Sequence, residues 1–118
     1  MNTNYTFKDT FTLSQKLTVY IPATTDVNKQ IDNTVYVDKC AAMLSEYFGG
    51  ATSCAALGYW MSPEYGLVKE ATTQVFAYCA DEALRDHIQD VIDFCESLKV
   101  DLSQECIALE LNNEMHFI

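Results

Sequence analysis

The sequence is poor in basic residues. It contains one arginine, Arg85, and seven lysine and arginine residues in total against seventeen acids, which gives a net charge of −10. Proteins that bind nucleic acid directly, or that bind an anionic membrane surface, use clustered lysine and arginine side chains. The composition therefore disfavours both classes, and we expect neither nucleic acid nor a membrane among the direct partners.

Long hydrophobic runs and targeting signals are absent as well. No apolar run approaches the roughly 20 residues that a helix needs to cross a bilayer. Residues 1–5 have neither the basic start nor the apolar stretch of a signal peptide. We therefore expect a cytoplasmic protein.

Signatures of catalysis and of metal binding are also missing. The motifs GxxxxGK[ST], GxGxxG, HExxH and GxSxG do not occur, and no Ser-His-Asp set can be assembled. Of the two histidines, His87 has no partner motif, and His116 has only Glu114 beside it on an alternating strand. These are too few ligands for a metal site. We therefore predict no metal, no cofactor and no enzymatic activity.

The cysteines are odd in number and lack any CxxC spacing. This pattern fits neither a disulfide framework nor a zinc site. Each cysteine lies in an apolar stretch, where a free thiol behaves as a small hydrophobic side chain and suits a reducing compartment. A reactive thiol is the alternative that remains open. The five are Cys40, Cys54, Cys79, Cys95 and Cys106.

The length of 118 residues and a hydrophobic content of 49% fit one domain with a real core. Residues 1–14 are polar with interleaved aromatic residues, which predicts an N-terminal arm or an edge strand. Residues 15–118 form the single α+β domain in this interpretation. We see neither an internal repeat nor a low-complexity tract.

Hydrophobic periodicity predicts the order of the elements. In some segments apolar residues alternate, as they do in strands, and in others they recur at helical spacing. Gly49-Gly50 predicts the end of the first helix, and Asp81 is the predicted N-cap of the second. Asn112-Asn113 is typical of a two-residue hairpin turn. The predicted strands are 17–21, 51–61, 67–79, 106–111 and 114–118, and the predicted helices are 35–48 and 81–99. This β-α-β-β-α-β order favours a ferredoxin-like sandwich, an antiparallel sheet with two helices on one face and room for extra terminal strands.

Four short segments carry a resemblance to a known family. They are Phe48-Gly49-Gly50-Ala51-Thr52, Gly58-Tyr59-Trp60, Leu67-Val68-Lys69-Glu70 and Gln104-Glu105. Over residues 44–111 the chain resembles a family of small, functionally uncharacterised bacterial α+β proteins that are associated with phages and conjugative elements. The resemblance implies a fold and a genomic setting, and it implies no activity.

The acids concentrate in the second half of the chain. Between Asp81 and Glu114 there are ten acids against two bases. Five of the acids recur at helical spacing and predict one charged stripe, with roughly 5–6 Å of rise between neighbours, similar to the charge spacing of a nucleic-acid backbone. We interpret the stripe as a docking face for a basic protein, such as a nucleic-acid-handling defence enzyme that a phage protein inhibits, or else as a solvated face. The stripe residues are Glu82, Asp86, Asp90, Asp93 and Glu96.

Aromatic residues on the predicted hairpin permit a second interpretation. Ferredoxin-like domains often pair through their sheets, so a homodimer could enclose a pocket for a small molecule, with or without catalysis. Alternation divides these side chains between the two faces of the sheet, and an ordinary core is the simpler explanation. Separately, Glu70 of the Lys69-Glu70 pair could act as a general base if it is buried, although a solvent-facing or locally paired side chain is the simpler explanation. The candidate pocket residues are Tyr59, Trp60, Phe76 and Tyr78.

Overall fold

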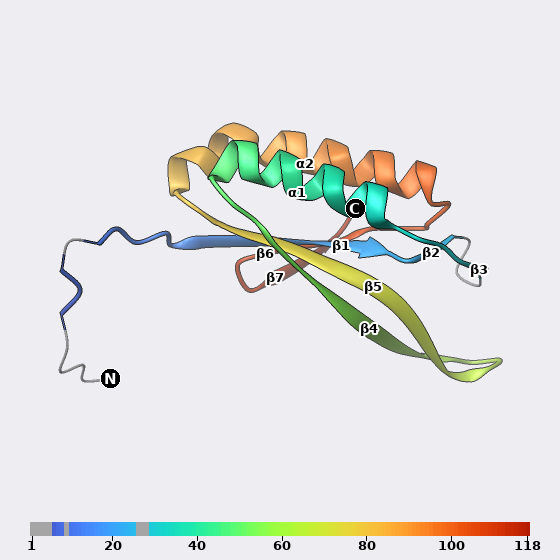
Figure 1. Cartoon of the computed structure of the whole chain (residues 1–118). Coiled ribbons are helices and arrows are strands. Elements are labelled where there is room, and N and C mark those ends of the chain that lie inside the picture. The colour runs from blue at the N-terminus through green and yellow to red at the C-terminus, as the bar shows by residue number, and fades with distance from the viewer. Residues whose placement is uncertain (1–5, 9, 26–28) are drawn as a thin grey trace.

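The computed structural model describes residues 6–8, 10–25 and 29–118, which form one five-stranded antiparallel sheet, a small two-stranded sheet and two helices. Both helices lie side by side on one face of the large sheet (Figure 1). The predicted ferredoxin-like class is therefore confirmed. The elements are β1 (Gln15–Pro22), β2 (Thr24–Thr25), β3 (Lys29–Gln30), α1 (Thr34–Phe48), β4 (Thr52–Ser62), β5 (Gly66–Cys79), α2 (Asp81–Asp101), β6 (Ala108–Leu111) and β7 (Glu114–Phe117).

The strand order β4-β5-β1-β6-β7 explains how the chain closes its core. Each helix connects two strands that run in the same direction and leaves space for one strand between them, as in a split βαβ unit. β5 fills the space between β1 and β4, and β1 fills the space between β5 and β6. β7 is the extra terminal strand, and it pairs with β6 through the predicted Asn112-Asn113 turn.

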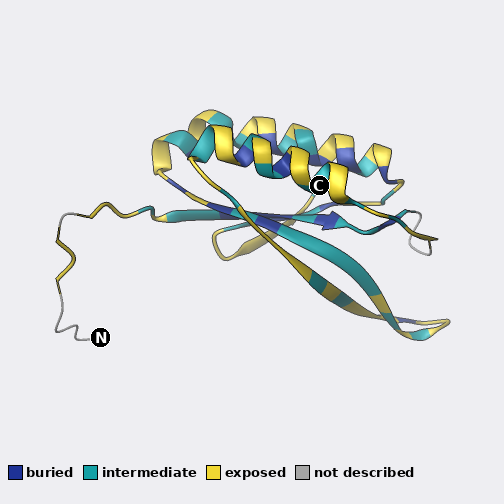
Figure 2. Cartoon of the chain, viewed as in Figure 1, coloured by how far each residue is buried: buried dark blue, intermediate teal, exposed yellow. Residues whose placement is uncertain are grey.

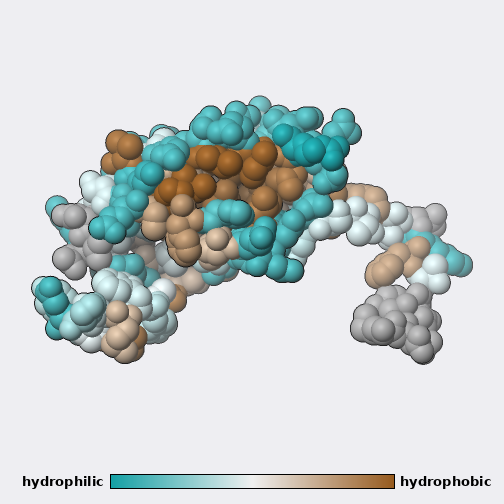
Figure 3. All heavy atoms as spheres, turned by 180° about the vertical axis from the view of Figure 1, so that it is seen from behind, coloured by the Kyte–Doolittle hydropathy of each residue, from teal (hydrophilic) through white to brown (hydrophobic). Residues whose placement is uncertain are grey.

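The core lies between the sheet and the helices (Figure 2). Leu17, Val19 and Ile21 alternate along β1 and are fully buried, together with Val75 on β5. α2 contributes one apolar stripe, whose buried members are Leu84, Val91, Cys95 and Leu98. Seen from behind, hydrophilic side chains cover the helical layer and apolar side chains gather in a band beneath it (Figure 3).

The ends of the helices differ from the sequence expectation at two points. Asp81 is the first residue of α2, and the N-cap is Ala80 without a side-chain cap. The Asp81 carboxylate accepts hydrogen bonds from Arg85 and Gln15 instead. α2 also continues past Lys99 to Asp101, because Leu98 and Leu102 are both buried and extend the apolar stripe. The predicted stop of α1 is confirmed, since Gly49 takes the left-handed conformation with φ of 92°.

Two segments extend away from the sandwich and make the molecule long (Figure 1). The radius of gyration is 16.3 Å, whereas a compact chain of this length has about 13.5 Å. One segment is the tip of the β4–β5 hairpin, which projects beyond the helices. The other precedes β1, where residues 6–8 and 10–14 are neither helix nor strand. In the described part of the chain, no helix is long and apolar enough to cross a membrane.

Candidate functional site

The face of the sheet opposite the helices is uncovered and carries polar and aromatic side chains. Since Leu17, Val19 and Ile21 point to the helices, the alternate residues Thr18 and Tyr20 point to this open face, where Thr18 is buried among its neighbours and Tyr20 is half-buried. Pairing then places Gln74 of β5 beside Tyr20, and Cys54 of β4 beside Gln74. One row of open-face side chains therefore crosses three strands.

A hydrogen-bonded pair stands at the centre of the open face. The Tyr20 hydroxyl donates to the Glu110 Oε1 atom of β6 at 3.0 Å. Burial, and then the adjacent Glu110 carboxylate, raise the pKa of Tyr20 above its usual value of 10.0. Tyr20 is therefore neutral near pH 7, and its hydroxyl proton is donated to Glu110. This hydrogen bond fixes the orientation of both side chains.

A pocket of about 190 Å³ opens beside this pair. Its lining contains one carboxylate, that of the half-buried Glu70 on β5. Glu70 lies directly opposite Gly58 on β4, and because glycine has no side chain the space over the strand stays open. The described residues offer the Glu70 side chain no hydrogen bond or ion pair, so its carboxylate is available to a ligand. The lining residues are Tyr20, Pro22, Thr24, Gly58, Glu70, Ala71, Thr72, Gln104, Cys106, Ile107, Ala108 and Phe117.

The connection between α2 and β6 forms one wall of the pocket. The Gln104 side-chain amide donates to the backbone oxygens of Thr24 at 3.0 Å and of Leu102 at 3.1 Å. The bond to Thr24 holds the connection against β2. Cys106, which is exposed, follows on the same wall and has a free thiol at the pocket rim.

The four candidate aromatic residues do not gather in one place. Phe76 and Tyr78 meet edge to face with ring centroids 6.3 Å apart, and the Lys16 amine lies over both rings at 4.5 and 5.4 Å. Phe76 and Tyr78 line a separate apolar groove of about 520 Å³ beside Gly49-Gly50. Trp60 shares the open face but lies toward the hairpin tip, and Tyr59 points to the opposite face.

The five acids of the stripe all lie on the exposed side of α2. Three of them have neighbours on the same helix. Asp90 is 3.5 Å from the His87 Nδ1 atom, Asp93 accepts from Gln89 at 2.9 Å, and Glu96 is 3.1 Å from the Lys99 amine. His87 also stacks on Tyr47 of α1 with ring centroids 4.0 Å apart, so its ring belongs to the contact between the helices. Within the described residues, no group of three or more potential metal ligands occurs.

Comparison with known proteins relates the fold to two solved structures. No protein-family model matches the chain, and no curated protein matches its sequence. A phage SAM lyase in the apo state superposes with a TM-score of 0.68 at 15% identity, over 96% of this chain and 95% of that chain. A phage SAM lyase in complex with S-methyl-5'-thioadenosine superposes with a TM-score of 0.65 at 14% identity, over 97% of this chain and 95% of that chain. The chain has the fold of a phage SAM lyase.

These neighbours contradict one sequence expectation. We expected a protein without enzymatic activity because no catalytic motif was present, yet both structures with this fold are enzymes. The expectation was wrong because the absent motifs belong to other reaction classes. They mark nucleotide phosphate binding, zinc hydrolysis and serine hydrolysis, and their absence does not exclude a lyase.

Sequence reasoning also passed over the polar pair and the pocket wall. Tyr20 and Glu110 are separated by 90 positions, and only the sheet order brings β1 and β6 together. The alternation of each strand did indicate that both side chains point away from the core, because each residue lies between two apolar residues of its strand. Gln104 and Cys106 carried no comparable signal, since they lie in a connection without periodicity.

Proposed function

We propose that this chain is a lyase that releases S-methyl-5'-thioadenosine from S-adenosylmethionine (SAM) at the pocket beside Glu70. The observation that carries the proposal is the likeness of nearly the whole chain to two phage SAM lyases, one of them in complex with that thioether. The pocket adds support, because it places an unpaired carboxylate and a neutral tyrosine on the face that the helices leave uncovered.

The bond changes define what the site must do. SAM carries a sulfonium cation, and release of the thioether breaks the bond between that sulfur and the γ-carbon of the methionine part. The electron pair of the broken bond moves to sulfur. The four-carbon remainder then either closes on its own carboxylate oxygen as a lactone, or loses a β-proton to a base and gains a double bond. Neither route needs an oxidant or a reductant.

Glu70 is the residue to which we assign the main role. Its carboxylate matches the ammonium group of the amino-acid part of SAM, and a charge-assisted hydrogen bond there would hold that part in one conformation. On the elimination route the same carboxylate is the base within reach of the pocket. Tyr20 forms one side of the pocket, and its hydrogen bond to Glu110 fixes the position of its hydroxyl.

The test is direct detection of product. Purified protein is incubated with SAM, and S-methyl-5'-thioadenosine is followed by liquid chromatography and mass spectrometry. We expect turnover by the native chain and at least a tenfold loss in Glu70→Gln. Glu64→Gln is the matched control, because Glu64 is an exposed residue of the hairpin turn, and it should keep native activity. No product, together with no rise in melting temperature on adding the thioether, would reject the proposal.

The biological setting follows from the same proposal. We propose that the chain is carried by a phage or conjugative element, as its sequence resemblance implies, and that it acts in the host cytoplasm, where its five free thiols remain reduced. Cleavage of SAM removes the methyl donor that host methylation reactions consume. An enzyme of this kind would act against defence functions that depend on SAM.

A second proposal concerns the acidic stripe and is compatible with the first. The exposed side of α2 presents five carboxylates, while the pocket lies on the opposite side of the sheet. We propose that this helix docks a basic surface of another protein, with electrostatic steering of the encounter.

A further inference from the structure

We propose that the pocket beside Glu70 selects its ligands by positive charge and leaves the carboxylate of SAM unrecognised, so that aminopropyl ligands without a carboxylate bind more tightly than their amino-acid counterparts. This inference rests on the proposed function, because it concerns how the same pocket holds the amino-acid part of its substrate. The observation behind it is which hydrogen-bonding groups of the pocket lining are already used within the protein.

The hydroxyl groups of the lining are mostly committed to internal hydrogen bonds. The Tyr20 hydroxyl donates to Glu110 at 3.0 Å, and the Thr72 hydroxyl donates to the backbone oxygen of Ile21 at 3.1 Å. The third hydroxyl of the described lining, that of Thr24, belongs to a buried residue. A carboxylate can only accept hydrogen bonds. Two of the three hydroxyl protons are therefore unavailable to the carboxylate of a ligand.

The Gln104 side-chain amide has also used its donors. Its nitrogen donates to the backbone oxygens of Thr24 and Leu102. An amide nitrogen carries two N–H groups, so both are used by the protein. The described residues donate no hydrogen bond to the side-chain oxygen of Gln104. The free group of this side chain is therefore an acceptor, which matches an ammonium group and not a carboxylate.

The charges at the pocket have one sign. Glu70 belongs to the lining, and Glu110 is bonded to the lining residue Tyr20. The described lining contains no lysine, arginine or histidine. The large sheet has two lysines. Lys69 precedes Glu70 on β5 and points to the other face of the sheet, while Lys16 lies over two aromatic rings, four residues before Tyr20 on β1. The pocket therefore favours a cation.

The charges of SAM make this preference specific. Its sulfonium and ammonium groups are positive, and its carboxylate is negative at pH 7. When the ammonium group bonds to Glu70, the carboxylate on the same carbon lies within about 5 Å of the Glu70 oxygens, where like charges repel. An aminopropyl chain presents the same ammonium group without this repulsion. Decarboxylated SAM and its thioether are therefore the ligand class that fits the pocket best.

The test compares two thioethers that differ only in the carboxylate. They are S-adenosylhomocysteine and its decarboxylated form, and neither has the sulfonium group that the lyase step requires. We expect isothermal titration calorimetry on the native chain to give a Kd about tenfold lower for the decarboxylated thioether. This preference should shrink from low to moderate salt, because it is electrostatic. Equal affinities, tighter binding of S-adenosylhomocysteine, or no binding of either would overturn the proposal.

Variants at Glu70 assign the preference to this pocket. Glu70→Gln should bring the two Kd values to within about twofold of each other, whereas Glu70→Asp keeps the charge and should retain most of the preference. Glu64→Gln is the control, because Glu64 is exposed in the hairpin turn, and it should keep the native preference. Melting temperatures show that each variant is folded. A folded Glu70→Gln variant with the full native preference would overturn the assignment.

Lys29 tests the alternative that a cation outside the lining holds the carboxylate. It is exposed on β3 and pairs with Thr25, next to the lining residue Thr24. We expect Lys29→Gln to leave the ratio of the two Kd values unchanged, and a loss of S-adenosylhomocysteine binding alone would overturn the proposal. Neither thioether is cleaved in these measurements. The order of binding can therefore fail while SAM is cleaved, and it can hold while SAM remains intact.

Discussion

At the residue scale, burial divides the five thiols into two groups. Cys40, Cys79 and Cys95 are buried in the core, whereas Cys54 and Cys106 are exposed. Burial raises the pKa of Cys40 and of Cys95 from 9.0 to about 12. The buried thiols are therefore protonated and unreactive across the neutral range, and a thiol reagent should reach only the exposed group.

The buried thiols predict a loss of stability in alkali. In the unfolded chain Cys40 and Cys95 ionise near pH 9, while in the folded chain they keep their protons to about pH 12. The unfolded state binds fewer protons between these values, so the free energy of unfolding is fully present below pH 9 and falls as pH rises toward 12. Urea midpoints at pH 8, 9 and 10 measure this fall.

The control for this prediction is a pair of cysteine variants. Cys40→Ala should lessen the fall between pH 8 and 10, and Cys54→Ala, at an exposed thiol, should leave it unchanged. Part of the fall in unfolding free energy with pH remains in both variants, because burial also raises the pKa of Tyr20 and of Tyr47. An equal slope in Cys40→Ala and the native chain would contradict the argument.

At the element scale, periodicity was enough to predict the sandwich. The alternation of Leu17, Val19 and Ile21 identified β1, and the spacing of Leu84, Val91 and Cys95 identified α2, because each pattern is set by burial on one side of an element. The N-cap of α2 was wrongly assigned, since the Asp81 carboxylate bonds to Arg85 of the same helix and to Gln15 of β1, and the second contact is not visible in the local sequence.

The candidate site was less predictable for the same physical reason. Tyr20, Glu70 and Glu110 come from three strands, and their proximity depends on sheet order and register. Glu70 attracted notice in the sequence as a polar residue within a strand. Its opening onto a pocket depends on Gly58, which lies opposite only because of the hairpin register.

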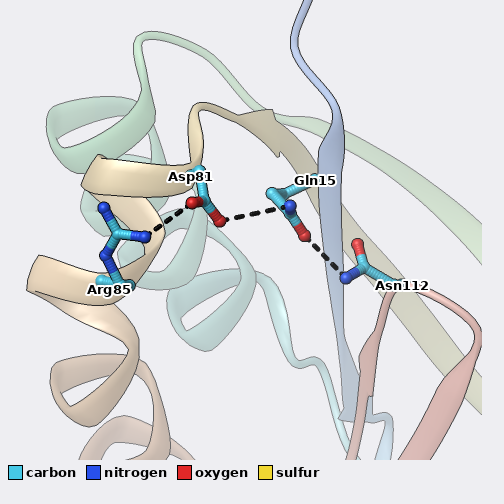
Figure 4. Close-up of polar contacts among 4 residues, drawn as sticks. All are labelled: Gln15, Asp81, Arg85 and Asn112. Carbon is cyan, nitrogen blue, oxygen red and sulfur yellow. Dashed lines mark hydrogen bonds and ion pairs between the residues drawn. The ribbon is translucent and has the colours of Figure 1, made fainter.

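Asn112 joins the β6–β7 turn to the start of β1 and, through Gln15, to α2 (Figure 4). Its Oδ1 accepts from the Lys16 backbone N–H at 3.0 Å, and its Nδ2 donates to the Gln15 Oε1 at 2.7 Å. The Gln15 amide in turn donates to Asp81 at 3.3 Å. Asn112 also adopts a φ of 57°, which asparagine tolerates better than other residues with a Cβ atom.

Substitution of Asn112 separates the contribution of its side-chain hydrogen bonds from that of its left-handed backbone conformation. Asn112→Gly keeps the backbone freedom and removes the side-chain bonds, so it should cost about 1–2 kcal/mol of unfolding free energy. Asn112→Ala removes the bonds and adds left-handed strain, so it should cost about 1 kcal/mol more. Asn113→Ala is the neighbouring control and should change the urea midpoint little. Equal midpoints for the glycine variant and the native chain would show that the side-chain bonds are not stabilising.

At the scale of the whole molecule, the acidic stripe of α2 and the pocket beside Glu70 lie on opposite sides of the sheet. The sheet separates the acidic outer side of α2 from the open face with Glu70 and Tyr20. Between Asp81 and Glu114 ten acids stand against two bases, so most of the negative field arises from this half of the chain. A basic partner drawn to the helix would leave the pocket accessible.

This separation predicts that binding and catalysis respond to different substitutions. Reversal of Asp86, Asp90 and Asp93 to lysine should abolish capture of a basic host protein from a lysate of the native host, because it inverts the local field on α2. The same variant should keep its rate of SAM cleavage. Capture should weaken from low to moderate salt, since the Debye length shortens to about 8 Å at physiological ionic strength.

The matched control makes the same change in net charge elsewhere. Reversal of Asp38, Glu64 and Glu114 to lysine makes the same change in net charge at three exposed positions outside α2. If the local field guides docking, this variant keeps most of the captured protein. If both variants lose it equally, net charge alone explains the association and the stripe has no special role. Capture that survives the α2 reversal would place the partner on another surface.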